Sequence, residues 1–236
     1  SPNDGDYFFA MEYLQGQSLK QFVRDRYKAG NPVGVDEAIT LLQSVADALR
    51  YAWEHHQLLH RDVKEENIFV TTKGRVVLVD FGIAAKAAEQ RNSQSVNQRE
   101  AIDQSLGGRY VLGTRSHLAP ESTSARRETP HRDGYALAVT AYYVLDGERL
   151  PFNDLRTWVD PEMPQSLEAQ TDIRPDVREA IWTALRAGFA FEQSKRPNSA
   201  WAFMETLAAA TKATINVDAQ LWSNVCAADD EAGYKR

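Results

Sequence analysis

Five polar side chains recur at fixed spacing in the short stretch LLHRDVKEENIFV, residues 58–70. They form what we call the polar loop (residues 60–67) and are His60, Arg61, Asp62, Lys64 and Asn67. The stretch lies between a long predicted helix and a predicted hairpin. Loops placed by rigid elements are where binding and catalytic residues concentrate. A solvated charged turn is the alternative interpretation for an isolated His-Arg-Asp.

A second carboxylate belongs to the same region, because Asp80 in VDFG follows Asp62 across the hairpin. Two β-rich runs, 68–70 and 76–79, are joined by a turn at residues 73–74. This pattern predicts a small hairpin. The hairpin would fold the two carboxylates back toward each other, so that they share one site.

The elements that must position this loop are mostly helical. In residues 18–30, Ser18 is a candidate N-cap and Gly30 follows the end of the predicted helix. Residues 34–56 repeat apolar side chains at spacings of three and four. Both segments are therefore predicted to be amphipathic helices. Residues 134–147 are apolar nearly all round and predict a buried helix, on which two amphipathic helices, 175–190 and 199–213, should pack.

Three other segments have weaker signals. The aromatic run YFFAMEYL, residues 7–14, predicts a strand. Residues 84–108 are rich in Gln, Ser, Asn and Arg, which is typical of a mobile loop, and the last ten residues should be a frayed tail.

The composition excludes several classes of protein. The 236 residues, 43% hydrophobic and with a net charge of −6, indicate a globular chain without the basic surface that nucleic acids require. A single cysteine, Cys226, leaves no internal disulfide or cysteine-based zinc cluster, and indicates a cytoplasmic location. No apolar run approaches the roughly 18 residues that span a bilayer, so we expect no membrane contact by this segment.

The motifs resemble the protein-kinase signature, in which H-R-D-x-K-x-x-N is followed by D-F-G and A-P-E. Here they occupy residues 60–67, 80–82 and 119–121. The resemblance extends from Tyr7 to about residue 210. Lysine two positions after the aspartate resembles the serine/threonine branch. The resemblance implies a mainly α fold, the C-terminal lobe of a protein kinase, with a small β-hairpin that bears the catalytic and metal-binding loops.

The same resemblance implies transfer of the γ-phosphate of ATP to serine or threonine hydroxyls of a protein substrate. Asp62 would accept the hydroxyl proton, Lys64 would steady the γ-phosphate, and Thr114 would hydrogen-bond both residues. Asn67 and Asp80 carry oxygen ligands suited to Mg²⁺, a hard cation that takes its remaining coordination from water and substrate phosphates. Surface salt bridges and loop caps are the alternative interpretation of these side chains.

Other residues receive supporting roles from the resemblance. His60 and Phe81 would pack against the buried helix, and Asp133 would accept hydrogen bonds from the backbone of the polar loop, since a buried carboxylate is tolerable only when hydrogen-bonded. Glu121 would pair with Arg196. Plain core packing and an ordinary surface pair are the alternatives. The structural or regulatory residues are His60, Arg61, Phe81, Gly82, Glu121, Asp133 and Arg196.

The segment AMEYLQG resembles the strand that joins the two kinase lobes. The backbone of Glu12 and Leu14 would hydrogen-bond adenine, Met11 would line the pocket behind it, and Phe69 would also contact the nucleotide. The alternative is an apolar strand that caps the helical domain. The implied division is 1–17 for the last strand and hinge of another lobe, 18–212 for the C-terminal lobe, with 80–121 as activation segment, and 213–236 for a tail.

The sequence departs from the family pattern at its start, where the glycine-rich phosphate loop and the strand lysine of the N-terminal lobe are absent. We therefore expect these residues alone to bind Mg·ATP weakly or not at all and to show no measurable phosphate transfer. The chain is then either a fragment of a longer kinase or a natural lobe-only relative, and a partner chain or domain could supply the N-terminal lobe. The fragment is favoured, because every acid, lysine and metal ligand of the motifs is retained. A non-catalytic, kinase-derived interaction module is the alternative function.

Arginine before the catalytic aspartate marks, in this family, kinases that are switched by phosphorylation of the activation segment, because a guanidinium pairs bidentately with phosphate. Arg61 therefore predicts autophosphorylation within residues 84–116 and poor order of residues 85–108 without phosphate. A merely flexible insertion is the alternative. The candidate acceptors are Ser93, Ser95, Ser105 and Thr114.

Overall fold

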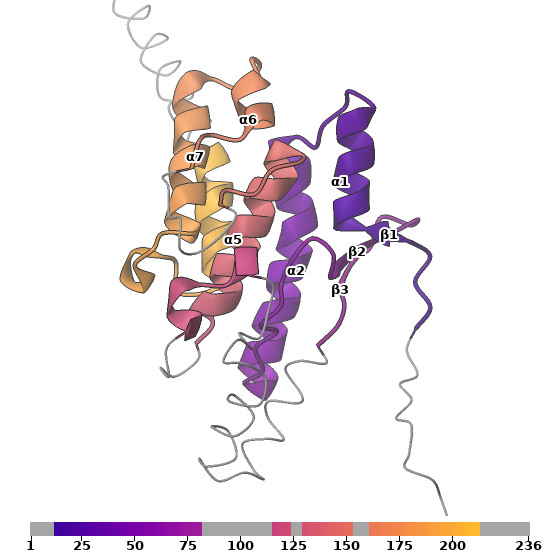
Figure 1. The fold of residues 1–236 in the computed structure, drawn as a ribbon, viewed down its shortest axis with the longest axis vertical. Helices are drawn as coiled ribbons and strands as arrows, with labels where there is room; N and C mark the ends of the chain where they lie inside the picture. The colour runs from indigo at the N-terminus through magenta and orange to yellow at the C-terminus, as the bar shows by residue number, and fades with distance from the viewer. Residues whose placement is uncertain (1–11, 82–114, 124–128, 153–160, 213–236) are drawn as a thin grey trace, which may run out of the picture.

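The computed structural model describes residues 12–81, 115–123, 129–152 and 161–212 (Figure 1). Within these ranges helices form most of the molecule, and a small sheet lies at one side of them (Figure 1). The predicted mainly α fold is confirmed. Among the residues described, no helix is both long and apolar enough to cross a bilayer.

The first two helices form where the sequence predicts them. Helix α1 spans Leu19–Lys28, and the Ser18 hydroxyl caps it by accepting a hydrogen bond from the Gln21 amide at 3.2 Å. Helix α2 spans Val35–His56 and ends at Gln57 in the left-handed conformation. Apolar side chains every three or four residues bury one face of α2 as far as Ala52, and the chain then continues into the polar loop.

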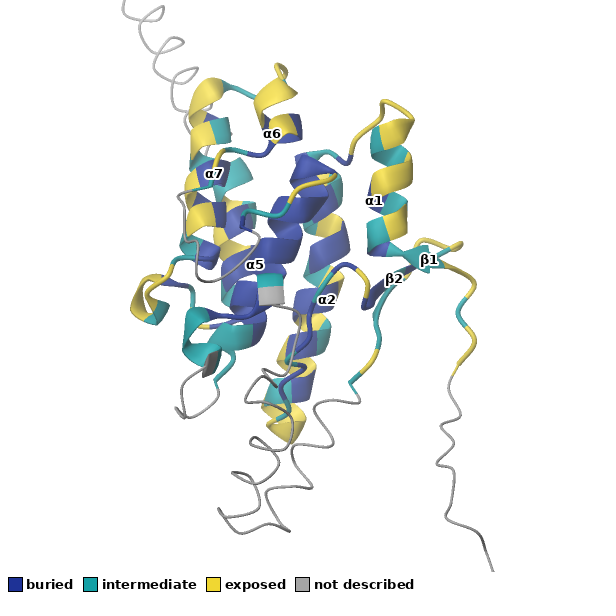
Figure 2. Ribbon diagram, viewed as in Figure 1, coloured by how far each residue is buried: buried dark blue, intermediate teal, exposed yellow. Residues whose placement is uncertain are grey.

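Helix α5, His131–Asp146, is the central element, as its uniformly apolar sequence predicts. It is dark blue along nearly its whole length in Figure 2, because almost every side chain is buried. Helices α7, Pro175–Gly188, and 200–212 pack around it with the short α6, Gln165–Ala169. A Cβ at Gly188 would lie 2.5 Å from the Ala138 methyl, so glycine permits the close approach of α7 to α5.

The sheet has three antiparallel strands in the order β1, β2, β3. Strands β2, Ile68–Thr71, and β3, Val76–Leu78, form the predicted hairpin, and Gly74 takes the left-handed conformation in its turn. Strand β1, Gly16–Ser18, pairs with β2 and carries no β-rich pattern that would predict it. The predicted strand 7–14 is wrong over residues 12–14, which are irregular since no strand pairs with them.

Three single-turn 3₁₀ helices complete the description: η1, Arg115–His117, η2, Pro120–Thr123, and η3, Gln193–Lys195. Helix η1 packs against α5, which brings the chain before residues 119–121 next to the core. The predicted mobile segment 84–108, the strand residues 7–11 and the predicted tail lie outside the described residues.

Candidate active site

Asp62, Lys64 and Asn67 converge within the polar loop. Lys64 Nζ lies 2.8 Å from Asp62 Oδ2, and Asn67 Nδ2 donates to the same carboxylate oxygen at 2.9 Å and to the Asp62 carbonyl at 2.8 Å. Asp62 is 6% exposed, so its carboxylate is largely shielded from solvent and lies beside the ammonium group of Lys64. Such a carboxylate is oriented by its neighbours, as a proton acceptor requires.

Asp133 on α5 anchors the start of the loop. Its Oδ2 accepts the His60 amide at 2.8 Å and its Oδ1 accepts the Arg61 amide at 2.9 Å. Burial raises the pKa of Asp133, and the two amide hydrogen bonds oppose that rise. The loop is therefore tied by two main-chain bonds to the most buried helix. Arg61 takes the left-handed conformation, φ 69°, which costs free energy for a side chain with a Cβ.

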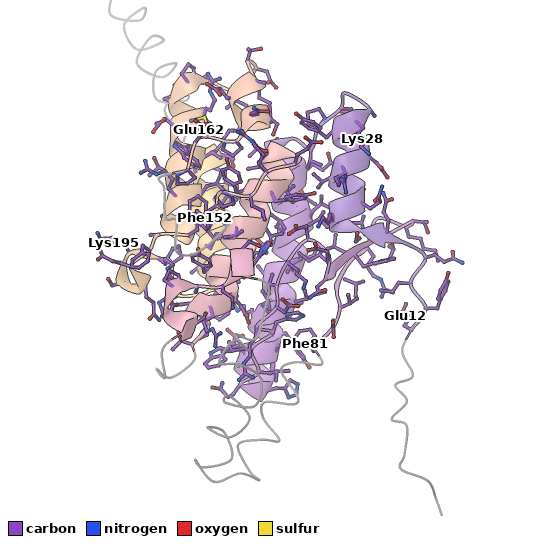
Figure 3. All side chains as sticks on the ribbon, viewed as in Figure 1. Glu12, Lys28, Phe81, Phe152, Glu162 and Lys195 are labelled. Atoms are coloured by element: carbon purple, nitrogen blue, oxygen red, sulfur yellow. The ribbon has the colours of Figure 1, made fainter. Side chains whose placement is uncertain are left out.

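His60 joins the loop to the end of the hairpin. Its Nε2 lies 3.0 Å from the Val79 carbonyl, and its Nδ1 accepts the Asp62 amide at 3.3 Å. These two partners favour the tautomer with hydrogen on Nε2. The imidazole also meets the Phe81 ring edge-on, at 4.5 Å between centroids. Figure 3 labels Phe81 below the sheet.

Asn67 and Asp80 lie at the open end of the hairpin. The register pairs Ile68 with Leu78, and the Val79 amide donates to the Asn67 carbonyl at 2.9 Å, so Asp80 follows directly after this bond. Asp80 is exposed and has a φ of 69°, a conformation that is rare for residues other than glycine and is typical of functional sites.

The oxygen donors at this end fit a hard divalent cation. Asn67 uses its Nδ2 for both bonds to Asp62, which leaves its Oδ1 for another partner, and Asp80 adds a carboxylate. Within the described ranges no group of three or more His, Cys, Asp or Glu side chains is arranged to hold a metal. A two-ligand protein site suits Mg²⁺, which completes its coordination with water and phosphate oxygens.

A buried contact that the sequence analysis did not find joins the polar loop to η1. Glu65 Oε2 lies 3.0 Å from His117 Nε2, and both side chains are 3% exposed. Burial raises the pKa of Glu65, but the adjacent His117 imidazole, together with a backbone hydrogen bond and the charge of Lys20, holds that pKa below its usual range. No motif signalled this contact, because residues 65 and 117 are far apart in the chain and Glu65 looks like one more charged loop residue.

Glu121 and Arg196 form the expected ion pair in bidentate geometry, with nitrogen to oxygen distances of 2.9 and 2.6 Å. Arg196 also donates to the Ala190 carbonyl at 2.7 Å and lies 4.9 Å from the centre of the Tyr135 ring. The guanidinium thus holds η2, α5 and the chain before helix 200–212 together.

The described residues expected near adenine lie on the chain before β1 and on β2. Glu12 is exposed and pairs with Arg75, and it lines, with Leu14 and the turn between β2 and β3, a cavity of about 430 Å³. Phe69 is half-buried in the middle of β2 and does not line that cavity. Three predicted site residues lie outside the described residues: Met11, Gly82 and Thr114.

Comparisons with known proteins show the family to which the chain belongs. A model of the protein kinase domain matches residues 2–212. Serine/threonine-protein kinase PrkC of Bacillus subtilis is 28% identical over 182 residues, which are 70% of this chain and 25% of PrkC. Serine/threonine-protein kinase PknF of Mycobacterium tuberculosis is 34% identical over 148 residues, 61% of this chain and 28% of PknF.

Tyrosine-protein kinase MasK of Myxococcus xanthus is 28% identical over 214 residues, 86% of this chain and 31% of MasK. The chain thus spans between a quarter and a third of the length of these relatives. The matched residues include the polar loop, the hairpin and the helices around α5. Because the family model covers most of the sequence, the chain belongs to the protein kinase family.

Proposed function

We propose that the natural protein containing this chain is a serine/threonine protein kinase that transfers the γ-phosphate of ATP to protein hydroxyls. The observation that carries the proposal is that Lys64 and Asn67 both contact the carboxylate of Asp62 at hydrogen-bond distance. Phosphoryl transfer asks the protein chiefly for positioning and for compensation of negative charge, and this cluster supplies both.

In the proposed reaction Asp62 accepts the proton of the attacking hydroxyl. Its carboxylate has one oxygen fixed by Lys64 and Asn67, so its orientation is set before the substrate arrives. Lys64 lies beside this carboxylate and places a positive charge near the transferring phosphoryl group.

Asn67 Oδ1 and the Asp80 carboxylate would hold Mg²⁺, and the bound ion neutralises charge on the phosphate oxygens. The hairpin register keeps these two side chains at one end of the sheet, and the His60 bond to Val79 fixes the residue before Asp80. Asp80 has a left-handed backbone two residues after the end of β3.

The acceptor specificity rests on Lys64, which stands two positions after Asp62 as in the serine/threonine branch, and on the names of PrkC and PknF. The name of MasK makes tyrosine the competing acceptor. The test is incubation of the natural protein with ATP, Mg²⁺ and a general protein substrate, followed by identification of the phosphorylated residues by mass spectrometry. Phosphoserine and phosphothreonine are expected. Phosphotyrosine alone, or no transfer, overturns the proposal.

A further inference from the structure

Glu65 and His117 belong to separate parts of the chain and meet in the interior. Glu65 is in the polar loop, and His117 is the last residue of η1. The Nε2 to Oε2 distance is 3.0 Å, but the contact does not have the alignment of a conventional hydrogen bond. Neither atom has another hydrogen-bond partner among the described residues. Each of these two water-excluded polar atoms therefore depends on the other.

Both partners are held from their other sides. The Glu65 carbonyl accepts the Lys20 amide at 3.0 Å, at the start of α1. His117 Nδ1 lies 3.1 Å from the Ser116 hydroxyl, and η1 packs against α5. If the serine donates to Nδ1, the hydrogen of the ring is on Nε2 and faces Glu65. The contact between the two side chains thus links the polar loop to η1, and each of these segments is also held by a second contact.

The pair lies one residue from the proposed reaction centre. Lys64 and Glu65 are consecutive, and the first contacts Asp62 while the second contacts His117. Asp133 on α5 holds the start of the loop, and η1 packs on the same helix. The polar loop is therefore connected to α5 in two ways, directly through Asp133 and indirectly through His117 and η1. A displacement of His117 would reach Lys64 across a single peptide unit.

We propose that Glu65 and His117 are a positioning pair, which fixes the polar loop against the segment before residues 119–121 so that Lys64 and Asp62 keep their mutual geometry. This inference rests on the proposed kinase function for its catalytic consequence. The contact between Glu65 and His117, which we call the tie, does not depend on that function, and its effect on the polar loop can be measured without an activity assay.

The experiment uses the natural protein with His117→Leu, Glu65→Leu, the double variant and His117→Gln, whose amide keeps a donor near the position of Nε2. Each leucine variant should lower kcat per folded molecule at least about tenfold and leave KM for ATP unchanged, since misplacement by about 1 Å can cost much more than that. His117→Gln should recover part of the lost kcat. The double variant should be no slower than the slower single, because one contact cannot be lost twice.

Asp146→Asn is the matched control. Asp146 is equally buried and bonds Arg149 and the Gln165 amide at the opposite end of α5 from Asp133. It should lower the melting temperature while kcat of the folded molecules stays within about twofold of wild type. The proposal is overturned if the leucine variants only melt earlier at unchanged kcat, if their effects on kcat multiply in the double variant, or if Asp146→Asn reduces kcat as much as they do.

Hydrogen exchange separates failure of this inference from failure of the proposed function. The Lys20 amide is bonded to the Glu65 carbonyl, and the Asn67 amide to the Lys64 carbonyl, so both report on the loop. In His117→Leu both should exchange at least about tenfold faster than in wild type. Unchanged exchange rejects the tie whether or not the protein is active. Faster exchange in a protein without phosphate transfer supports the tie and rejects the kinase proposal.

Discussion

Asn67 Nδ2 donates to two oxygens of Asp62, the main-chain carbonyl at 2.8 Å and the carboxylate at 2.9 Å. The two bonds close the chain from residue 62 to residue 67 into a small ring. This ring restricts both the backbone of the loop and the direction of the carboxylate. It also fixes which atom of Asn67 is left over, since the amide nitrogen is used and the oxygen remains for a metal ion.

Asn67→Asp should damage the loop even though the two side chains have nearly the same shape. The change removes a donor and places a second carboxylate beside the buried carboxylate of Asp62, so the two charges repel. We expect the free energy of unfolding, from urea denaturation at neutral pH, to fall by about 2 kcal/mol. Asn198→Asp, at an exposed residue, is the control and should change it by less than about 0.5 kcal/mol. Equal effects of the two substitutions would contradict the role of the ring.

Asp133→Ala should destabilise the fold through the loss of two main-chain hydrogen bonds. It leaves the amides of His60 and Arg61 without their acceptor, and each buried unsatisfied donor costs about 1–3 kcal/mol. We expect a loss of about 3 kcal/mol in urea unfolding, and a smaller loss for Asp133→Asn, which keeps one acceptor oxygen. If the two variants were equally stable, the pair of main-chain bonds would not be the reason that this carboxylate is buried.

Two tyrosines on α5 predict how stability changes at high pH. Burial, with a smaller contribution from Asp146, raises the pKa of Tyr142 to about 12, and burial, with Glu65, does the same for Tyr143. The folded state therefore favours the neutral phenols. Their stabilisation is complete below pH about 10, the ordinary pKa, and is lost as the pH rises to about 12.

Tyr142→Phe and Tyr143→Phe remove these ionisations. In each variant the unfolding free energy should fall less steeply between pH about 10 and about 12 than in wild type, and in the double variant less steeply still. Urea unfolding at a series of alkaline pH values measures this slope. Parallel slopes for all four proteins would show that the tyrosines ionise alike in the folded and unfolded chains.

The helices could be predicted because local patterns determine them. Ser18 caps α1, the three- and four-residue spacing of apolar side chains marks the buried face of α2, and the nearly uniform apolar sequence of α5 marks a buried helix. The hairpin was predictable from its β-rich runs and from Gly74 in its turn. Strand β1 was not, because a three-residue strand of Gly, Gln and Ser exists only through its pairing with β2.

Within the candidate site, too, contacts between neighbouring residues could be predicted and a contact between distant residues could not. The residue types of the polar loop were evident from their spacing, and the two partners of the Asp62 carboxylate, Lys64 and Asn67, belong to the same loop. The Glu65 contact with His117 was not evident, since it depends on how η1 packs against α5. A buried pair between distant segments has no local signal, and only the tertiary structure brings its two members together.

Asp62→Asn in the natural protein tests the central claim most directly, because it removes the negative charge while the amide oxygen can still accept from Lys64 and Asn67. The measurement is the initial rate of γ-phosphate transfer from ATP to a protein substrate, with circular dichroism to verify the fold. We predict that the folded variant loses at least about a hundredfold in kcat, as expected when a positioned proton acceptor is removed. A folded Asp62→Asn variant that transfers phosphate at the wild-type rate would contradict the assignment of the polar loop as the reaction centre.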